Sequence, residues 1–150
     1  MTDSYWRFVE PIWYTVNIHG GEDVFLEEFN KVTEKQKVLF AAHWAQSEIF
    51  NGGLGQFFSN STGVLAPEAV TAFKAIGMPK CSSILAASMD FFGDNYPRDK
   101  VVRKEVFERF YERFGEDAEP MLEHEDAMAL EIEKENRGFE DAANKYANKG

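Results

Sequence analysis

The sequence predicts an all-α protein, a single-domain bundle of about six to eight helices. Apolar residues recur three and four positions apart along most of the chain, which is the periodicity of amphipathic helices. No segment shows the sustained alternation of apolar and polar residues that is typical of a half-buried strand. A chain of 150 residues that is 44% hydrophobic and 15% aromatic can bury one sizeable core, so we take residues 1–150 as one domain.

The first thirty residues have helical spacing that a proline interrupts. Pro11 lies inside the pattern, and proline kinks or breaks a helix because it lacks a backbone N–H. Either a kinked helix or a helix that begins at Pro11 would satisfy both signals. The apolar positions are Tyr5, Phe8, Val9, Ile12, Trp13 and Val16.

The clearest helix is predicted from Thr33 to Phe50. Thr33 followed three places later by Gln36 has the form of a capping box, in which each side chain bonds the other residue's backbone N–H. The segment Asn51–Gly53 then supplies residues that tolerate positive φ, which predicts the end of the helix and a turn of the chain.

Three more helices are predicted between Pro67 and Gly115. The first two cover 67–77 and 84–93, and each ends at a glycine. The third is capped by Asp99 and mixes charges of both signs at four-residue spacing, which is typical of a self-compensated surface. We expect this third helix to bury Val102, Val106, Phe110 and Phe114.

The last predicted helix is acidic, with Asp117 as its cap and Pro120 in its first turn. Glu125 falls on the apolar side of this helix. Such a residue either lies at the margin and reaches water or is partly buried and shares a proton. The apolar face comprises Ala118, Met121, Leu122, Met128, Ala129 and Ile132.

The negative charge of the chain is concentrated in one segment. Of the 26 acidic residues, 11 lie between Glu116 and Asp141 against two basic ones, an excess of nine, whereas the remaining 15 acidic and 14 basic residues nearly balance. A local field of this kind attracts cationic partners. The carboxylates expected along one side of the helix are Glu116, Glu119, Glu123, Asp126 and Glu133.

The chain offers little for catalysis or for binding a cofactor. The lone Cys81 excludes an internal disulfide, and the three histidines have no metal-ligand spacing. The glycine-rich segment 52–55 lacks the Lys-Ser/Thr of a phosphate-binding loop. There is no basic and apolar leader and no run of about 20 apolar residues. We therefore expect a cytoplasmic binding protein with no catalytic residue, no metal, no cofactor and no membrane contact.

The stretch from Glu48 to Gly63 resembles the signature of the DMP-type family of bacterial DNA-mimic proteins. In that family a Glu, an Asn-Gly-Gly turn, a Gln-Phe-Phe step and a following Asn recur. The matching residues here are Glu48, Asn51, Gly52, Gly53, Gln56, Phe57, Phe58 and Asn60. From the residues alone we expect Gln56 and Asn60 to satisfy backbone groups at a tight junction, and Phe57 and Phe58 to enter the core.

The resemblance implies an all-α protein that can form a homodimer and imitates the phosphates of duplex DNA. Its partner would be a basic, repressor-like DNA-binding protein, and it would not bind nucleic acid itself. The expected helix of about 19 residues is roughly 28 Å long, close to the 34 Å of one duplex turn. Two alternatives remain: the acidic face is only solvated surface, or the protein is a small ligand-binding or enzymatic domain that uses Glu48, Asn51, Gln56 and Asn60.

Overall fold

The computed structural model describes residues 4–149, which form eight α-helices, four short 3₁₀-helices and no strand. The predicted all-α class and the predicted number of helices are confirmed. The α-helices are α1 (Trp6–Val9), α2 (Glu22–Phe29), α3 (Glu34–Ser59), α4 (Ala66–Ala75), α5 (Pro79–Met89), α6 (Lys100–Phe114), α7 (Leu122–Lys134) and α8 (Phe139–Ala147). The 3₁₀-helices are η1 (Glu10–Ile12), η2 (Ser61–Leu65), η3 (Asp90–Phe92) and η4 (Glu135–Arg137).

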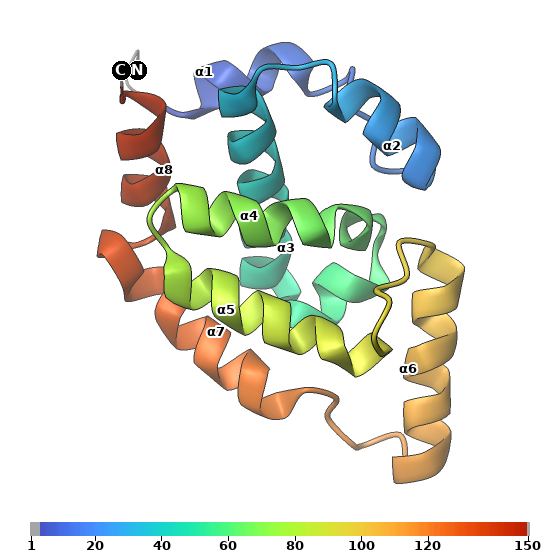
Figure 1. The fold of residues 1–150 in the computed structure, drawn as a ribbon. Coiled ribbons are helices and arrows are strands. Elements are labelled where there is room, and N and C mark those ends of the chain that lie inside the picture. Colours follow the sequence, from blue (N-terminus) through green and yellow to red (C-terminus); the bar gives the residue numbers. More distant parts are fainter. Residues whose placement is uncertain (1–3, 150) are drawn as a thin grey trace.

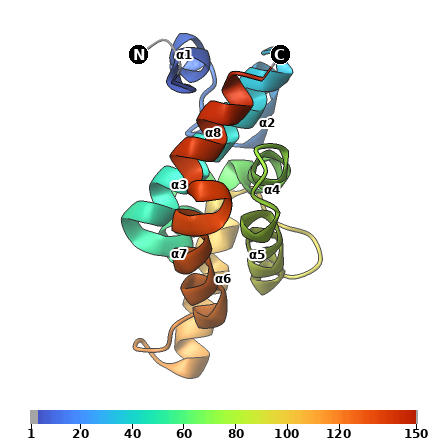
Figure 2. The same cartoon turned by 90° about the vertical axis from the view of Figure 1, so that its left-hand side faces the viewer.

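Helix α3 runs through the middle of the molecule, and helices α1, α4, α6, α7 and α8 pack against it (Figure 1). Helix α4 forms an antiparallel pair with α5, and α7 passes beside α5 on the way to α8. Figure 2 shows α4 and α5 on one side of α3 and α7 and α8 along its edge. One cluster of buried side chains draws residues from all eight α-helices.

Helix α3 begins as the sequence predicts and then bends where the sequence predicts a turn. The Thr33 hydroxyl accepts a hydrogen bond from the Gln36 N–H at 3.2 Å, and the Gln36 side chain accepts one from the Thr33 N–H at 3.0 Å. At Gly52 and Gly53 the backbone leaves the helical region, with φ values of −150° and +81°. The helix resumes in a new direction and continues to Ser59, so the glycines make a kink within α3.

Helices α4, α5 and α6 lie in the predicted stretches, although α5 begins at Pro79, before Ile84. The side chain of Asp99 accepts a hydrogen bond from the Val101 N–H at 2.8 Å, as expected of an N-cap. The predicted buried face of α6 is right for Val106 and Phe110, which are half-buried, and wrong for Val102 and Phe114. Arg103 and Phe107 face the interior, whereas Val102 and Phe114 are 40% and 59% exposed. This side of α6 faces the interior because the Arg103 guanidinium donates hydrogen bonds to backbone carbonyls there.

The acidic helix is shorter than predicted, because α7 begins at Leu122 and not at Asp117. A residue that precedes a proline is driven out of the helical region, so Glu119 before Pro120 cannot continue a helical turn. Met121 then adopts left-handed geometry, with φ of 52°. As a correction to the prediction, Glu116 and Glu119 lie in the segment that leads to the helix.

The amino-terminal region follows neither of the two alternatives drawn from Pro11. Helix α1 ends at Val9, and Pro11 lies in the first turn of η1, where its missing N–H leaves no bond unmade. Trp13 then stacks on Trp44 of α3, with ring centroids 4.7 Å apart. Within residues 4–149, none of the helices combines the length and apolar character needed to cross a bilayer.

Candidate functional site

The polar residues of the signature motif brace the kink in α3. Glu48 precedes the kink, and its carboxylate accepts hydrogen bonds from Gln56 at 3.2 Å and from Asn60 at 2.8 Å, both beyond the kink. The Thr62 hydroxyl adds a third, longer bond at 3.4 Å. A single carboxylate thus joins the two limbs of the helix, which explains why a Glu and two amides belong to one motif.

The prediction for the motif is confirmed for its aromatic residues and wrong for its amides. Phe57 and Phe58 are fully buried. The side chains of Gln56 and Asn60 bond the Glu48 carboxylate, whereas we had expected them to satisfy backbone groups. The kink brings these side chains within reach of the carboxylate, and the sequence did not reveal that proximity. Asn51 is exposed on the outer side of the bend.

Both glycines of the kink are required by close neighbours. A Cβ atom at Gly52 would lie 2.0 Å from Oε1 of Gln56, and one at Gly53 would lie 2.7 Å from Oε1 of Glu125. Gly53 also has a positive φ, which side chains rarely adopt. The glycines therefore make room for the carboxylate and amide that hold the bend.

Glu125 reaches from α7 to the resumed part of α3. Its carboxylate accepts hydrogen bonds from the backbone N–H groups of Leu54, at 2.5 Å, and Gly55, at 3.1 Å. These are N–H groups of a new helical start, where the helix dipole also favours a negative charge. This role explains the position of Glu125 on the apolar side of α7. The sequence left two alternatives for Glu125, contact with water or a shared proton, and neither predicts these hydrogen bonds to the backbone.

Glu135 performs the same task for α5. Its carboxylate accepts hydrogen bonds from the backbone N–H groups of Lys80, at 2.6 Å, and Cys81, at 2.9 Å, in the first turn of that helix. Burial and the neighbouring Glu135 raise the pKa of the Cys81 thiol, which keeps this cysteine protonated and unreactive. Two acidic residues of the charged segment therefore point inward and fasten α7 and η4 to the core.

Arg103 is a buried cation that the sequence reasoning missed. Its guanidinium is fully enclosed and donates hydrogen bonds to four backbone carbonyls, those of Phe58, Asn60, Pro97 and Arg98. Desolvation lowers the pKa of this group. One of several arginines on a mixed-charge helix carries no signal of burial, because two of its four partners, Phe58 and Asn60, lie 45 and 43 residues away in the sequence.

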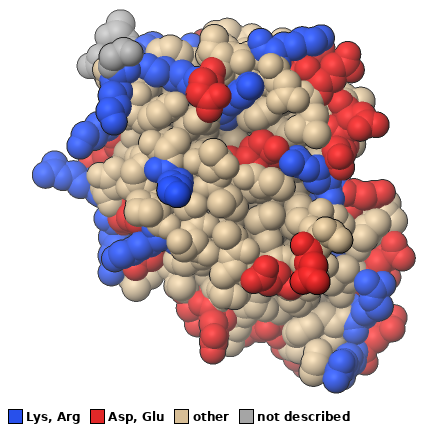
Figure 3. Space-filling view, viewed as in Figure 1, with Lys and Arg blue, Asp and Glu red and all other residues tan. Residues whose placement is uncertain are grey.

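The outer face of α7 carries carboxylates that form no ion pair within 4.0 Å with any described residue. Glu123, Asp126 and Glu133 are exposed on the same side of the helix, with Leu130 between them at 57% exposure. In the described part of the chain the only ion pairs within 4.0 Å join Lys31 to Glu27 and Glu28, and Arg98 to Glu68. In Figure 3 acidic side chains line the lower edge of the view, where α7 passes, while α6 at the lower right shows both signs.

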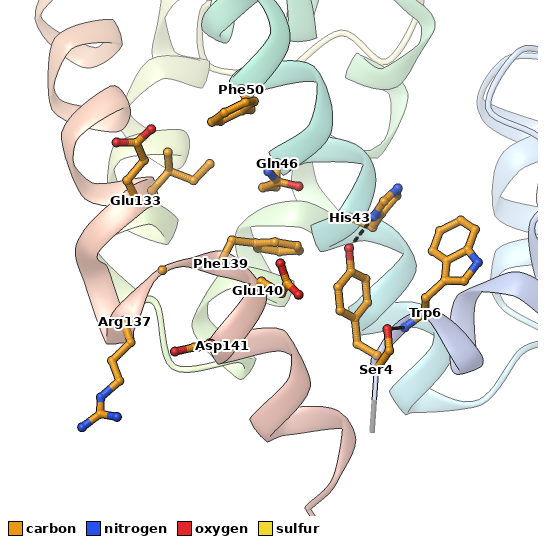
Figure 4. Close-up of a pocket in the computed structure, with 13 residues that line it drawn as sticks. Ser4, Trp6, His43, Gln46, Phe50, Glu133, Arg137, Phe139, Glu140 and Asp141 are labelled. Carbon is orange, nitrogen blue, oxygen red and sulfur yellow. Dashed lines mark hydrogen bonds between the residues drawn. The ribbon is translucent and has the colours of Figure 1, made fainter. Parts of the chain in front are cut away.

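A cavity of about 850 Å³ opens between α3, α7, η4, α8 and the start of α1. At its back the Tyr5 hydroxyl and Nδ1 of His43 are hydrogen bonded at 2.7 Å (Figure 4). Burial lowers the pKa of His43 to about 4 and raises that of Tyr5 to about 12, so both groups are neutral near pH 7. The sequence reasoning did not find this cavity, because distant segments build its wall.

The match to known proteins covers both the signature motif and the acidic segment. Residues 30–149 match the family described as DMP19-like protein. The chain belongs to the DMP19-like protein family. The suspected resemblance is thus confirmed, and the match reaches well beyond the motif on which it was first drawn.

No curated protein and no solved structure matches the chain. Among residues 4–149, no three His, Cys, Asp or Glu side chains gather in a way that could hold a metal ion. The role of this chain within the family therefore has to be argued from its own surface.

Proposed function

We propose that this protein is a DNA mimic, whose acidic face occupies the DNA-binding site of a basic, repressor-like protein. The main observation behind the proposal is the row of carboxylates on α7, Glu123, Asp126 and Glu133, which form no ion pair with the described residues. Two other carboxylates of the same segment, Glu125 and Glu135, cap helical turns of the core and hold this row in place. Membership of the DMP19-like family supports the proposal.

The spacing of the row supports phosphate mimicry over a shorter length than the sequence suggested. Glu123 and Asp126 are three residues apart, which places their Cβ atoms about 5 to 6 Å apart, comparable to successive phosphates along a strand, whereas Asp126 and Glu133 are seven residues apart, roughly 10 Å along the helix. The 13 residues of α7 span roughly 20 Å, less than one duplex turn of about 34 Å. Glu116 and Glu119 extend the charge into the preceding segment, and a homodimer would present two such rows.

A basic protein is the partner that this surface favours. Duplex DNA is itself polyanionic and would be repelled, whereas lysines and arginines that already fit phosphates would be attracted. The lack of ion pairs matters because a carboxylate already paired with lysine has little charge left to offer a partner. Rigid placement matters as well, because a mobile acidic tail would lose more entropy on binding.

The alternative of a ligand-binding or enzymatic site at Glu48, Asn51, Gln56 and Asn60 gains no such support. The Glu48 carboxylate is occupied by Gln56, Asn60 and Thr62. None of these residues lines the 850 Å³ cavity beside α3 or any of four smaller cavities in the described part of the chain. The motif is better explained as the brace of the α3 kink.

The test compares two variants that each remove three negative charges. The first carries Glu119→Gln, Glu123→Gln and Asp126→Asn. The control carries Glu105→Gln, Glu108→Gln and Glu112→Gln, which change exposed residues of the mixed-charge α6. Each protein is immobilised, exposed to a lysate of its source organism at low salt, and washed with duplex DNA as competitor.

We expect the wild type and the control to retain a basic protein that competing DNA displaces. The first variant should lose it, and the affinity of the wild type should fall steeply with added salt. Equal retention by both variants would refute the proposal, as would a captured protein that duplex DNA fails to displace. Far-ultraviolet circular dichroism checks that both variants keep the helical fold.

A further inference from the structure

The cavity between α3 and η4–α8 combines apolar walls with an acidic rim. The rings of Phe139 and Trp6 lie on two of its sides, and Phe50 stands at its edge with 67% of its surface exposed (Figure 4). Phe50 therefore presents an open aromatic ring beside the cavity. The Gln46 side chain also faces the cavity from α3.

The charge of the cavity is negative. Glu133, Glu140 and Asp141 contribute three negative charges and Arg137 one positive charge, which leaves a net charge of −2. None of these four side chains forms an ion pair within 4.0 Å among the described residues. The Arg137 side chain extends away from the centre of the cavity in Figure 4, so it does not fill the space.

The neutral pair at the back of the cavity favours binding over chemistry. His43 is a weak base because of its burial, and the Tyr5 hydroxyl and Nδ1 of His43 share one hydrogen bond while both groups stay neutral. Neither the Tyr5 phenol nor the His43 imidazole therefore gains or loses a proton near pH 7. They form a fixed neutral part of a lining that also contains aromatic rings and charged side chains.

We propose that an arginine side chain of the basic partner inserts into this cavity, with its guanidinium between the carboxylates and its flat face against the aromatic rings. The inference rests on the proposed function and adds to it a specific anchor. Arginine fits better than lysine because its planar cation stacks on aromatic rings and pairs with a carboxylate through two N–H groups. A cavity of 850 Å³ has ample room for that side chain.

The position of the cavity links it to the acidic row. Glu133 belongs to both, since it is the last exposed carboxylate of the row on α7 and part of the cavity lining. DNA-binding proteins commonly insert arginine into a groove between two lines of phosphates. A pocket bordered by carboxylates of α7 and α8 offers an arginine the same arrangement.

Two labelled peptides of equal charge separate the anchor from general attraction. One dodecapeptide alternates Gly with Arg and the other alternates Gly with Lys, and fluorescence anisotropy at low salt measures the affinity of each. We expect the wild type to bind the arginine peptide about three to ten times more tightly than the lysine peptide. Equal affinities would overturn the inference.

Single-residue variants then test whether the preference for the arginine peptide arises at the cavity. Phe50→Ala should remove it, whereas Phe114→Ala, which changes an equally open phenylalanine on α6, should leave it intact. Glu140→Gln, at an exposed position, provides a second variant in case Phe50→Ala fails to fold. A preference that survives in folded Phe50→Ala or in Glu140→Gln would overturn the inference.

The row on α7 is tested separately with Glu123→Gln combined with Asp126→Asn. This variant should bind both peptides more weakly and keep the arginine preference. If the peptides bind it as tightly as the wild type, the proposed mimicry is at fault and the anchor stands. Self-association of the wild type that disappears in Phe50→Ala, measured by sedimentation, would assign the cavity to a second copy of this chain and overturn the inference.

Discussion

The hydrogen bonds of Glu125 lead to a stability prediction with an internal control. In Glu125→Gln the side chain keeps its size but loses its charge, and its amide nitrogen would meet the N–H of Leu54 or Gly55, donor against donor. Hydrogen bonds to charged groups contribute roughly 1.5 to 3 kcal/mol each, and a buried donor left unpaired costs about 1 to 3 kcal/mol. Because the site is partly exposed, we expect the free energy of unfolding to fall by about 2 to 3 kcal/mol.

Urea unfolding followed by circular dichroism measures this loss. The matched control is Glu123→Gln, two residues away on the same helix, where the carboxylate is exposed and makes no hydrogen bond or ion pair within the described chain. The control should change stability by less than about 0.5 kcal/mol. If the two variants unfold at the same urea concentration, Glu125 does not hold α7 to the kink and the reasoning fails.

Two further predictions concern buried polar groups. Arg103→Met should lower stability by about 3 to 5 kcal/mol, because four carbonyls lose their donors; a loss in urea unfolding below about 1 kcal/mol would contradict the network. Because the pKa of His43 in the folded protein is about 4, below its ordinary 6.5, the unfolded chain binds more protons between those values. Stability should therefore fall as pH drops from 6.5 to 4, by at most about 3.4 kcal/mol. In His43→Phe the urea midpoint of unfolding should depend less on pH between 6.5 and 4. If the pH dependence is unchanged in this variant, groups other than His43 cause it.

Local signals in the sequence were enough to place most helices. The capping box at Thr33, the glycine bend at Gly52 and the cap at Asp99 each depend on residues within a few positions of one another. Such features are decided by backbone geometry and short-range hydrogen bonds, which a sequence displays directly. Helices α2 and α8 went unassigned, although Phe25 and Phe29 share one face of α2.

Features that depend on distant contacts could not be predicted in the same way. The burial of Arg103 depends on backbone carbonyls of residues as far apart as Phe58 and Arg98. The apolar residues of α6 instead indicated that a different face of the helix would be buried. The inward role of Glu125 became visible only once the kink of α3 faced α7. The cavity is built from α1, α3, α7, η4 and α8, so no single stretch of sequence carries its pattern.

The same acidic segment supplies both the exposed charge and the means of holding it in place. Nine excess negative charges within 116–141 repel one another. On α7 only Met128 and Ile132 are buried, so the burial of apolar side chains offsets little of this repulsion. Glu125 and Glu135 turn two of these charges into attractive contacts with backbone N–H groups, at the start of the resumed part of α3 and in the first turn of α5. Because those contacts fix the orientation of α7, the outward direction of Glu123, Asp126 and Glu133 depends on carboxylates that a partner would never touch. A change at Glu125 should therefore weaken partner binding by freeing the helix, even though the exposed charges are all retained.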